Sequence, residues 1–364
     1  MRIAILTIPL NANYGGILQA YALQTTLENI GEHDVKMLDN PYLLKMPPTI
    51  LRPFVYAARL IGRKLGVYSG NIKKEVGKNT YCANTYRFVH ENIHEYYINK
   101  LSDIPKDRFD AIVVGSDQIW RSYFFHLYFG EMPDAFLRFT NGWNIKRIAY
   151  APSFGVEKWE YSEAETEECK KYIKQMDAVS CREIEGVNMC KEYLDCDTVK
   201  HVLDPTMLLT KADYQKFVTV SKEKTGKLLV YVMDANNDKQ SLVDTVAKER
   251  SLTPASIYQA GVASPPSVEF WLQQFEDAEC VVTDSFHACV FSIIFGKEFI
   301  VYANKNRGLS RFTSLLKMFG LEDRLVFNAD EYKNIKINSS ISEAQKKLDM
   351  LRSESIDWLK KALI

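Results

Sequence analysis

One of the chain's six histidines, His287, stands at the junction of two apolar segments in VVTDSFHACVFSIIF. The segment before it, Cys280 to Val282, is short and mostly β-branched, which predicts the end of a buried strand. The segment after it, Ala288 to Phe295, predicts a helix packed against that strand. Turns from a parallel strand into a helix usually carry the chemistry of an α/β domain. His287 is therefore the strongest catalytic candidate in the sequence.

Polar residues directly before His287 could assist it. Thr283, Asp284 and Ser285 precede the predicted start of the helix, where free backbone N–H groups favour an anionic ligand. The helix dipole disfavours a charged imidazole there by about 0.3–1 kcal/mol. Asp284 or a bound anion could reverse this effect and keep the ring protonated. The alternative is a hydrogen-bonded core histidine without a ligand.

Two further predicted strand ends carry polar or charged side chains. Ser116, Asp117 and Gln118 follow the strand in DAIVVGSDQIW, a position that favours ligand contact. Asp117 could instead cap a helix. Arg182 and Glu183 follow the strand in DAVSC. A buried charged pair costs solvation energy unless it is paired or liganded, so a structural ion pair and an anion clamp are both open.

A glycine-rich segment, NYGGILQA, offers another candidate position near the N-terminus. Asn13 and Tyr14 precede Gly15 and Gly16, which allow a ligand to approach the backbone at the entry to a helix. An amphipathic helix follows, and Gly31 is expected to be its C-cap. Because the segment lacks a GxGxxG fingerprint and a P-loop lysine, a tight structural turn is an equal alternative.

One acidic residue is expected to be structural. Asp204 in LDPT follows a predicted strand and directly precedes Pro205. Its carboxylate should bond the backbone around the proline and shape a turn.

Alternating strands and helices must position these candidates. The pattern begins with the strand in RIAILTI, and restarts with GKLLVYVMD after a break within residues 209–227. Two alternating halves predict an α/β protein with two doubly wound, Rossmann-like domains facing a cleft. We expect an N-terminal domain of residues 1–210 and a C-terminal domain of residues 211–335. Residues 336–364 should form helices that pack back on the first domain.

Composition narrows the class of protein. The 364 residues exceed what one core usually supports, and 46 basic against 46 acidic side chains give no net field for nucleic acid. The seven cysteines lack a zinc spacing and suit buried thiols in a reducing cytoplasm. No apolar stretch approaches the 18 residues of a membrane span. We expect a cytoplasmic protein without a metal site.

The segment of residues 51–78 is strongly basic. It contains many Lys and Arg residues but a single acidic residue, Glu75, and its apolar residues recur at helical spacing. A basic amphipathic helix can lie on an anionic membrane, so peripheral contact at the inner face of the membrane is one hypothesis. A solvated helix covering the edge of the first domain is the alternative.

Several segments, in this order, resemble the polysaccharide pyruvyl transferase family over residues 2 to about 325. They are NYGGILQAYALQ, VVGSDQIW, YAPSFG, VSCREIEG, VLDPTMLL, VVTDSFHACVFSIIF and SRFTSLLKMFGL. The chain departs from the family in having HAC where HG is common, which should alter helix packing more than chemistry. The resemblance implies a two-domain fold of the GT-B glycosyltransferase type.

The resemblance also implies a reaction. The enolpyruvyl group of phosphoenolpyruvate moves to a sugar, which gives a cyclic pyruvate ketal and phosphate. The product would belong to a capsule, an exopolysaccharide or a wall glycan. The resemblance assigns the catalytic acid to His287 and donor binding to Arg182. Neither a cofactor nor a metal is expected.

The residue types suit this donor, which carries a carboxylate and a phosphate. Arg182 could clamp one end and the backbone from Ser285 to Ala288 the other. Arg311 is a further binding candidate, with a surface ion pair as the alternative. Protonation of the enol carbon suits a histidine that titrates near neutrality.

Some choices remain open at this point. Asp117, Glu183 or Asp284 could accept the protons of the sugar hydroxyls. The acceptor is a sugar, free or on a lipid carrier. The alternatives are a GT-B sugar-nucleotide glycosyltransferase of polysaccharide synthesis and a catalytically silent carbohydrate-binding relative.

Overall fold

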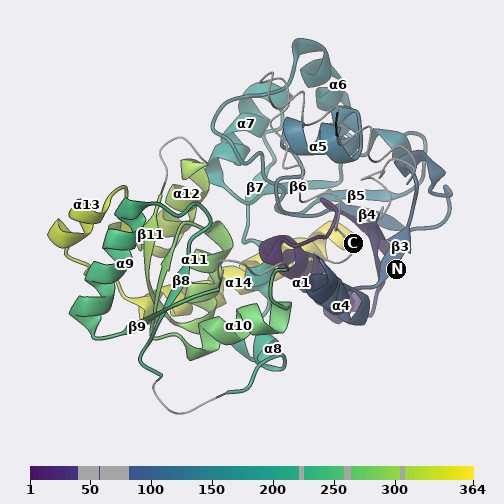
Figure 1. Ribbon diagram of the computed structural model, residues 1–364. Coiled ribbons are helices and arrows are strands. Elements are labelled where there is room, and N and C mark those ends of the chain that lie inside the picture. The colour runs from purple at the N-terminus through teal and green to yellow at the C-terminus, as the bar shows by residue number, and fades with distance from the viewer. Residues whose placement is uncertain (40–56, 58–81, 221–224, 258–263, 304–307) are drawn as a thin grey trace.

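The computed structural model shows two α/β lobes, with helices α1 and α14 where they meet (Figure 1). It describes residues 1–39, 57, 82–220, 225–257, 264–303 and 308–364. The basic segment of residues 51–78, proposed from the sequence for membrane contact, lies outside the described residues except for Ala57.

The N-terminal lobe is built on a parallel sheet. Within the described residues it has seven strands in the order β3-β2-β1-β4-β5-β6-β7. The order reverses between β1 and β4, which places the loops after these two strands at the ligand-binding edge of a doubly wound sheet. The strand bounds are Arg2–Leu6 (β1), Asp34–Asp39 (β2), Glu95–Tyr97 (β3), Ala111–Val114 (β4), Lys146–Ala149 (β5), Ala178–Cys181 (β6) and Lys200–His201 (β7).

The C-terminal lobe repeats this design with five parallel strands in the described part of the chain. Their order is β12-β11-β10-β8-β9, so the reversal lies between β8 and β10. The strands are Lys227–Tyr231 (β8), Thr253–Ser256 (β9), Cys280–Thr283 (β10), Glu298–Tyr302 (β11) and Leu325–Val326 (β12). The predicted class, two doubly wound Rossmann-like sheets, is confirmed.

Helices connect the strands as the periodicity of the sequence indicates. In the N-terminal lobe they are α1 (Tyr14–Gly31), α4 (Ala83–Asn92), α5 (Ser122–Tyr128), α6 (Glu163–Ile173) and α7 (Ile184–Leu194). The connection between the lobes holds the short 3₁₀ helix η4 (Pro205–Leu208) and α8 (Lys211–Gln215). The C-terminal lobe has α9 (Asn237–Arg250), α10 (Val268–Asp277), α11 (Phe286–Phe295), α12 (Leu309–Phe319) and α13 (Ala329–Asn334), followed by α14 (Ile341–Leu363). The other short 3₁₀ helices are η1 (Leu101–Asp103), η2 (Met132–Phe136), η3 (Arg138–Thr140) and η5 (Glu322–Arg324).

Helix α1 differs from the sequence prediction at both ends. It begins early enough to take Gly15 and Gly16 into its first turn, instead of leaving them in the preceding loop. It also runs through Gly31, and its C-cap is Glu32, with a φ of 50°. A Cβ atom at Gly31 would lie 2.4 Å from the His33 ring, so close packing explains this glycine.

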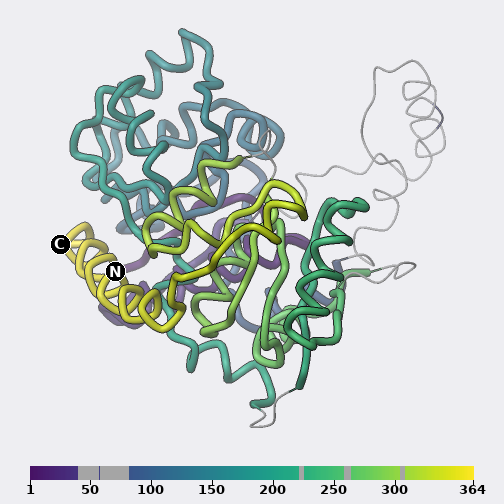
Figure 2. Tube along the Cα trace, turned by 90° about the vertical axis from the view of Figure 1, so that its left-hand side faces the viewer, coloured from purple at the N-terminus to yellow at the C-terminus, as the bar shows by residue number. Residues whose placement is uncertain are grey.

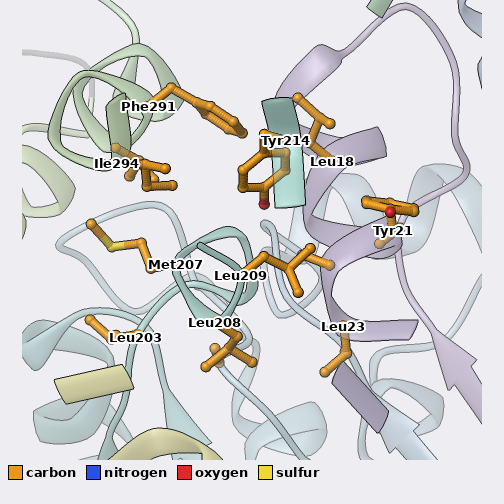
Figure 3. Packing of buried hydrophobic residues seen from close by; sticks show 14 of the residues in the cluster. Leu18, Tyr21, Leu23, Leu203, Met207, Leu208, Leu209, Tyr214, Phe291 and Ile294 are labelled. Carbon is orange, nitrogen blue, oxygen red and sulfur yellow. The ribbon is translucent and has the colours of Figure 1, made fainter. Parts of the chain in front are cut away.

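One buried apolar core joins the two lobes. Helix α8 lies between α1 and α11, and the ring centroids of Tyr214 and Phe291 are 5.0 Å apart. Figure 3 shows Tyr214 facing Phe291 on one side and Leu18 of α1 on the other. Burial of such aromatic and aliphatic side chains contributes roughly 1.5–3 kcal/mol each. The lobes therefore have a shared apolar base beneath the edges that carry the polar loops.

Helix α14 contacts both lobes. Its Ser355 hydroxyl accepts a hydrogen bond from the Leu203 amide at 3.2 Å, and Arg352 Nε donates to the Met207 carbonyl at 2.9 Å. Gln345 Nε2 donates to the Ile294 carbonyl of α11 at 3.4 Å. The two chain ends lie near one another in both views (Figures 1 and 2). Of the described helices, none is long and apolar enough to cross a membrane.

Candidate active site

His287 belongs to the C-terminal lobe but packs on the backbone of the N-terminal lobe. It lies in the first turn of α11, the helix that follows β10, and it is 9% exposed. A Cβ atom at Gly15 of α1 would lie 2.0 Å from His287 Nδ1. Only a residue without a side chain allows the imidazole to approach this closely, so Gly15 sets the position of the ring between the lobes.

Asp204 faces His287 from the other lobe. Its Oδ2 atom is 3.7 Å from His287 Nε2, which is an ion-pair distance; this nitrogen is buried without a hydrogen-bond partner. Asp204 Oδ1 accepts hydrogen bonds from the Thr206 amide at 3.0 Å and the Thr206 hydroxyl at 2.6 Å. The predicted turn is confirmed. The second oxygen adds an electrostatic role, because a carboxylate at this distance stabilises positive charge on the imidazole.

Arg182 lies beside this pair at the end of β6. Its Nη1 atom donates to Asp204 Oδ2 at 2.8 Å, and its guanidinium stacks over the Phe286 ring, 4.6 Å from the centroid. Two weaker ion pairs join Nη2 to Asp117 Oδ1 at 3.8 Å and Nε to Glu183 Oε2 at 3.7 Å. Arg182 is 4% exposed, and its Nε and Nη2 atoms lack a hydrogen-bond partner.

The charges around Asp204 fix its ionisation state. Burial alone raises the pKa of its carboxyl, but the nearby His287 and Arg182 charges and the Thr206 hydroxyl hold the pKa well below its usual range. Burial lowers the pKa of Arg182. The carboxylates of Asp204, Glu183 and Asp117 raise it by more, so the pKa lies above its ordinary value. Asp204 and Arg182 are therefore both charged at neutral pH.

Arg311, in the first turn of α12, adds a second, partly buried positive charge. Burial and then the charge of Arg182 lower the pKa of Arg311 to about 10. Its Nε atom is buried without a hydrogen-bond partner. A Cβ atom at Gly308 would lie 2.7 Å from Arg311 Nη2 and 3.2 Å from the Gly155 carbonyl oxygen, so this guanidinium lies against the N-terminal lobe. The two arginines repel each other unless an anion binds near both.

Asp117 and Asn13 join the loops that follow β4 and β1. Asn13 Nδ2 donates to Asp117 Oδ2 at 3.2 Å, across the reversal of the sheet. Asp117 has a φ of 60°, a left-handed conformation that is costly for a residue with a side chain. Strained backbone of this kind clusters at ligand-binding and catalytic positions. Gly16 leaves room for the Asn13 amide and Asp117 Oδ2, 3.1 and 3.5 Å from where a Cβ would lie.

A profile of the family described as "Polysaccharide pyruvyl transferase" matches residues 13–306. The matched range takes in Gly15, Arg182, Asp204 and His287, and it covers most of the chain. The chain belongs to the polysaccharide pyruvyl transferase family. The resemblance seen in the sequence segments is thereby confirmed, and the coarse function is that of a transferase.

Among the solved structures similar to this pyruvyl transferase family member, one with a TM-score above 0.5 supports the fold. UGT89C1 from Arabidopsis thaliana has 9% identity and a TM-score of 0.52, with 100% of this chain and 99% of that one covered. A putative UDP-N-acetylglucosamine 2-epimerase from Listeria monocytogenes has 11% identity and a TM-score of 0.47, with coverages of 99% and 91%. MurG from Acinetobacter baumannii has 9% identity and a TM-score of 0.43, with 99% of both chains covered. Comparison with curated protein sequences gave no significant match. The pyruvyl transferase chain has a fold of the GT-B type.

Some predicted site residues of this pyruvyl transferase support others. Ser116 is fully buried and donates through its hydroxyl to Asp204 Oδ2 at 3.5 Å. Glu183 Oε1 accepts from the Ser153 hydroxyl at 2.7 Å and from the Phe154 amide at 3.1 Å, which fixes the loop after β5. These contacts position the residues that surround Arg182.

Two other predictions receive less support from the geometry. Asp284 Oδ1 accepts from the Met233 amide at 2.7 Å, and its Oδ2 accepts from Lys239 Nζ at 2.7 Å. In the described part of the chain, His287 is not among these partners. Tyr14 packs flat against Trp271, with ring centroids 5.4 Å apart, and donates through its hydroxyl to the Pro266 carbonyl at 2.8 Å. These contacts join the lobes.

The remaining predicted binding residues lie at the edges of the site. Ser285 is the N-cap of α11, and its amide donates to Thr283 Oγ1 at 3.0 Å; its hydroxyl makes no capping bond. Gln118 packs against Gly155, where a Cβ would lie 2.2 Å from Gln118 Oε1. Gln118 Oε1 accepts from Arg121 Nη1 at 3.2 Å.

Proposed function

We propose that the protein transfers the enolpyruvyl group of phosphoenolpyruvate to a hexose of a surface polysaccharide, or of its lipid-linked precursor, and forms a pyruvate ketal. The family supports the pyruvyl transfer. The observation that carries the donor assignment is a set of buried N–H groups on Arg182, Arg311 and His287 that lack a hydrogen-bond partner among the described residues. An unsatisfied buried donor costs about 1–3 kcal/mol, and more when it is charged. A compact anion with a carboxylate and a phosphate would satisfy all three.

We assign the general acid to His287. Its Nε2–H would deliver a proton to the methylene carbon of phosphoenolpyruvate, which leaves an oxocarbenium-like centre at the adjacent carbon. One sugar hydroxyl then attacks this centre and loses its proton. The C–O bond to phosphate breaks, a neighbouring hydroxyl attacks in turn, and its proton is also released. The products are the cyclic ketal and phosphate. Asp204, 3.7 Å from Nε2, stabilises the charged imidazole before the transfer.

Among the acids considered from the sequence, Asp117 is the best placed proton acceptor. Both oxygens of Asp284 already accept hydrogen bonds. Oδ1 accepts from the Met233 amide, and Oδ2 accepts from the Asp234 amide and Lys239 Nζ. One oxygen of Glu183 holds the loop after β5. Among the described residues, the carboxylate of Asp117 accepts one hydrogen bond, from Asn13, and lies 3.8 Å from Arg182. Its position beside the donor cations fits a base for the attacking hydroxyl.

The alternative is a GT-B sugar-nucleotide glycosyltransferase. Such an enzyme would bind a diphosphate at the carboxyl edge of the C-terminal sheet, between β8 and β10. In this chain Asp284 already places a carboxylate there. It accepts the Met233 and Asp234 amides at 2.7 and 3.1 Å and neutralises Lys239 at 2.7 Å. An internal anion at this edge argues against a second, external one.

Donor binding separates the two functions. Thermal unfolding would be followed with phosphoenolpyruvate and, separately, with UDP-glucose and UDP-N-acetylglucosamine. We expect phosphoenolpyruvate alone to raise Tm, because a ligand that binds the native state stabilises it by mass action. Phosphate release from phosphoenolpyruvate would then be measured with a panel of free and lipid-linked galactosides, glucosides and mannosides. Stabilisation by the nucleotide sugars only would favour the glycosyltransferase.

A further inference from the structure

A small cavity lies at the edge of the N-terminal sheet, beside the donor cations. Its volume is about 170 Å³, and its polar lining includes the side chains of Asn11, Asn13, Asp117 and Gln118. These groups supply several hydrogen-bond donors and acceptors at close spacing. No Lys or Arg is among the described residues that line it. Such a lining suits an uncharged polyhydroxy ligand better than an anion.

This cavity connects to the chemistry through Asp117. One oxygen of Asp117 is 3.8 Å from Arg182 Nη2, and the other accepts from Asn13 at 3.2 Å. Gly16, which also lines the cavity, follows the Gly15 backbone on which His287 packs. A ligand in the cavity would therefore contact a carboxylate at the boundary of the proposed donor site.

A second, larger cavity shares one lining residue with the first. Tyr128 lines both of them, and the larger one has a volume of about 680 Å³. Only the larger volume is within the usual range of about 300–1,000 Å³ for ligand pockets. The smaller cavity can take no more than a compact group such as one sugar ring, whereas the larger one has room for a longer ligand.

Of the three basic side chains among the described residues that line the larger cavity, two have carboxylate partners, and the third, Lys100, is exposed to solvent. Arg138 Nη1 is 2.6 Å from Glu131, and its Nε is 2.9 Å from Asp134. His126 Nε2 is 2.7 Å from Glu165. Since Arg138 and His126 already have carboxylate partners and Lys100 is an exposed surface residue, the cavity is not a built site for a phosphate.

We infer that the two cavities form one acceptor groove for an uncharged glycan of at least two sugar residues. The reacting hexose occupies the small cavity beside Asp117, and the next sugar toward the reducing end occupies the large cavity beyond Tyr128. This inference rests on the proposed function, because Asp117 as the base decides that the reacting sugar occupies the small cavity. It makes the enzyme selective for acceptor length, because contacts remote from the reacting atoms contribute to transition-state binding.

The test compares acceptors that differ by one sugar. Methyl β-galactoside, methyl β-glucoside and methyl β-mannoside would be paired with lactose, cellobiose and β-1,4-mannobiose. Phosphate release from phosphoenolpyruvate gives kcat/KM for each. For the sugar that reacts, we expect the disaccharide to have a kcat/KM about tenfold higher or more. Equal values within a pair would overturn the inference.

A blocking variant locates the second sugar. Ser102 lines the large cavity and is exposed, so Ser102→Trp should narrow the cavity without disturbing the core. We expect it to remove the advantage of the disaccharide while the KM for phosphoenolpyruvate stays unchanged. Lys106→Trp, at an exposed position that does not line the cavity, is the matched control. An unaltered disaccharide preference in Ser102→Trp would contradict the placement.

A binding measurement keeps the inference testable without turnover. Saturation-transfer NMR on lactose, cellobiose and mannobiose reports which sugar rings contact the protein. We expect both rings of the bound disaccharide to receive saturation, and only the non-reducing ring to do so in Ser102→Trp. Contact by one ring in the wild type would overturn the groove. Two-ring contact without any phosphate release from phosphoenolpyruvate would retain the groove and reject the proposed donor.

Discussion

The imidazole of His287 lies directly on the backbone of Gly15, although the two residues belong to different lobes. A Cβ atom at Gly15 would come within 2.0 Å of Nδ1 and 2.3 Å of the adjoining ring carbon. The proposed acid is thus held in place by the first turn of α1 as well as by its own helix. This contact requires the two lobes to be together.

A double-mutant cycle tests this contact. Gly15→Ala should lower the free energy of unfolding by about 1–3 kcal/mol, as overpacking does in well-packed interiors. In a His287→Ala background the same change should cost clearly less, because the ring is gone. Urea denaturation of the wild type, both single variants and the double variant gives the coupling. An equal cost in both backgrounds would show that the residues do not touch.

Asp204 should make stability depend on pH in the acid range. Its pKa is held below the usual range, whereas the unfolded chain ionises near its ordinary value of about 3.9. The unfolded state therefore binds more protons as pH falls, so stabilisation present above about pH 5 is lost progressively below it. Asp204→Asn should be less stable at pH 7 by about 3–5 kcal/mol, since Arg182 loses its buried partner.

The measurement for Asp204 is urea denaturation at pH 7, 5, 4 and 3. The difference between wild type and Asp204→Asn should shrink toward low pH, because the Asp204 carboxylate of the unfolded wild-type chain becomes protonated there while that of the folded protein stays ionised. Two parallel curves would mean that Asp204 carries no stabilising charge in the folded protein.

Arg311 should favour binding at the expense of stability. Its charge is opposed by burial and by Arg182, which lower its pKa to about 10. Arg311→Gln should therefore leave Tm unchanged or raise it. The KM for phosphoenolpyruvate should rise about 10–100-fold, as expected for one lost charged hydrogen bond of about 1.5–3 kcal/mol. Thermal unfolding and phosphate-release kinetics check the two effects.

Arg324 provides a matched control for Arg311. It is fully buried, but it pairs with Glu298 at 2.8 Å in the C-terminal lobe. Arg324→Gln should lower Tm while leaving the KM for phosphoenolpyruvate unchanged. If Arg311→Gln behaved in the same way, its positive charge would be structural.

Asp117 and Asp284 should have separable effects. Asp117→Asn retains the shape of the proposed base and should lower kcat by about 10²–10⁴-fold, with little change in Tm. Asp284→Asn leaves Lys239 without its carboxylate and should lower Tm more than kcat. Circular dichroism melts beside phosphate-release kinetics distinguish them. A large loss of kcat in Asp284→Asn, with an unchanged Tm, would exchange the two roles.

Much of the fold could be predicted because strands and helices alternate regularly along the chain. The strands around Ile112, Val179 and Val281 are apolar runs that end in polar residues, and each lies where its pattern indicates. Strand β9, at Thr253–Ser256, is different. It is polar and mostly exposed at the edge of its sheet, so it lacks a hydrophobic signal.

The candidate site was predictable only in part, because its contacts join distant segments. Local pattern pointed to His287 and Arg182, since each directly follows a buried strand. It also showed that Asp204 makes a turn. The turn involves only one oxygen of Asp204. The other contacts Arg182, 22 residues away in the sequence, and His287 of the opposite lobe, and the local pattern gives no sign of these contacts. Tyr14, beside the critical Gly15, instead packs against Trp271.

Phosphate release from phosphoenolpyruvate by wild-type and His287→Ala protein, with a sugar that the wild type accepts, tests the central claim most directly. Folding of the variant would be verified by its thermal melt. With general acid catalysis removed, we expect release to fall by about 10²–10⁴-fold while the protein remains folded. Release at the wild-type rate from folded His287→Ala would contradict the assignment of the acid.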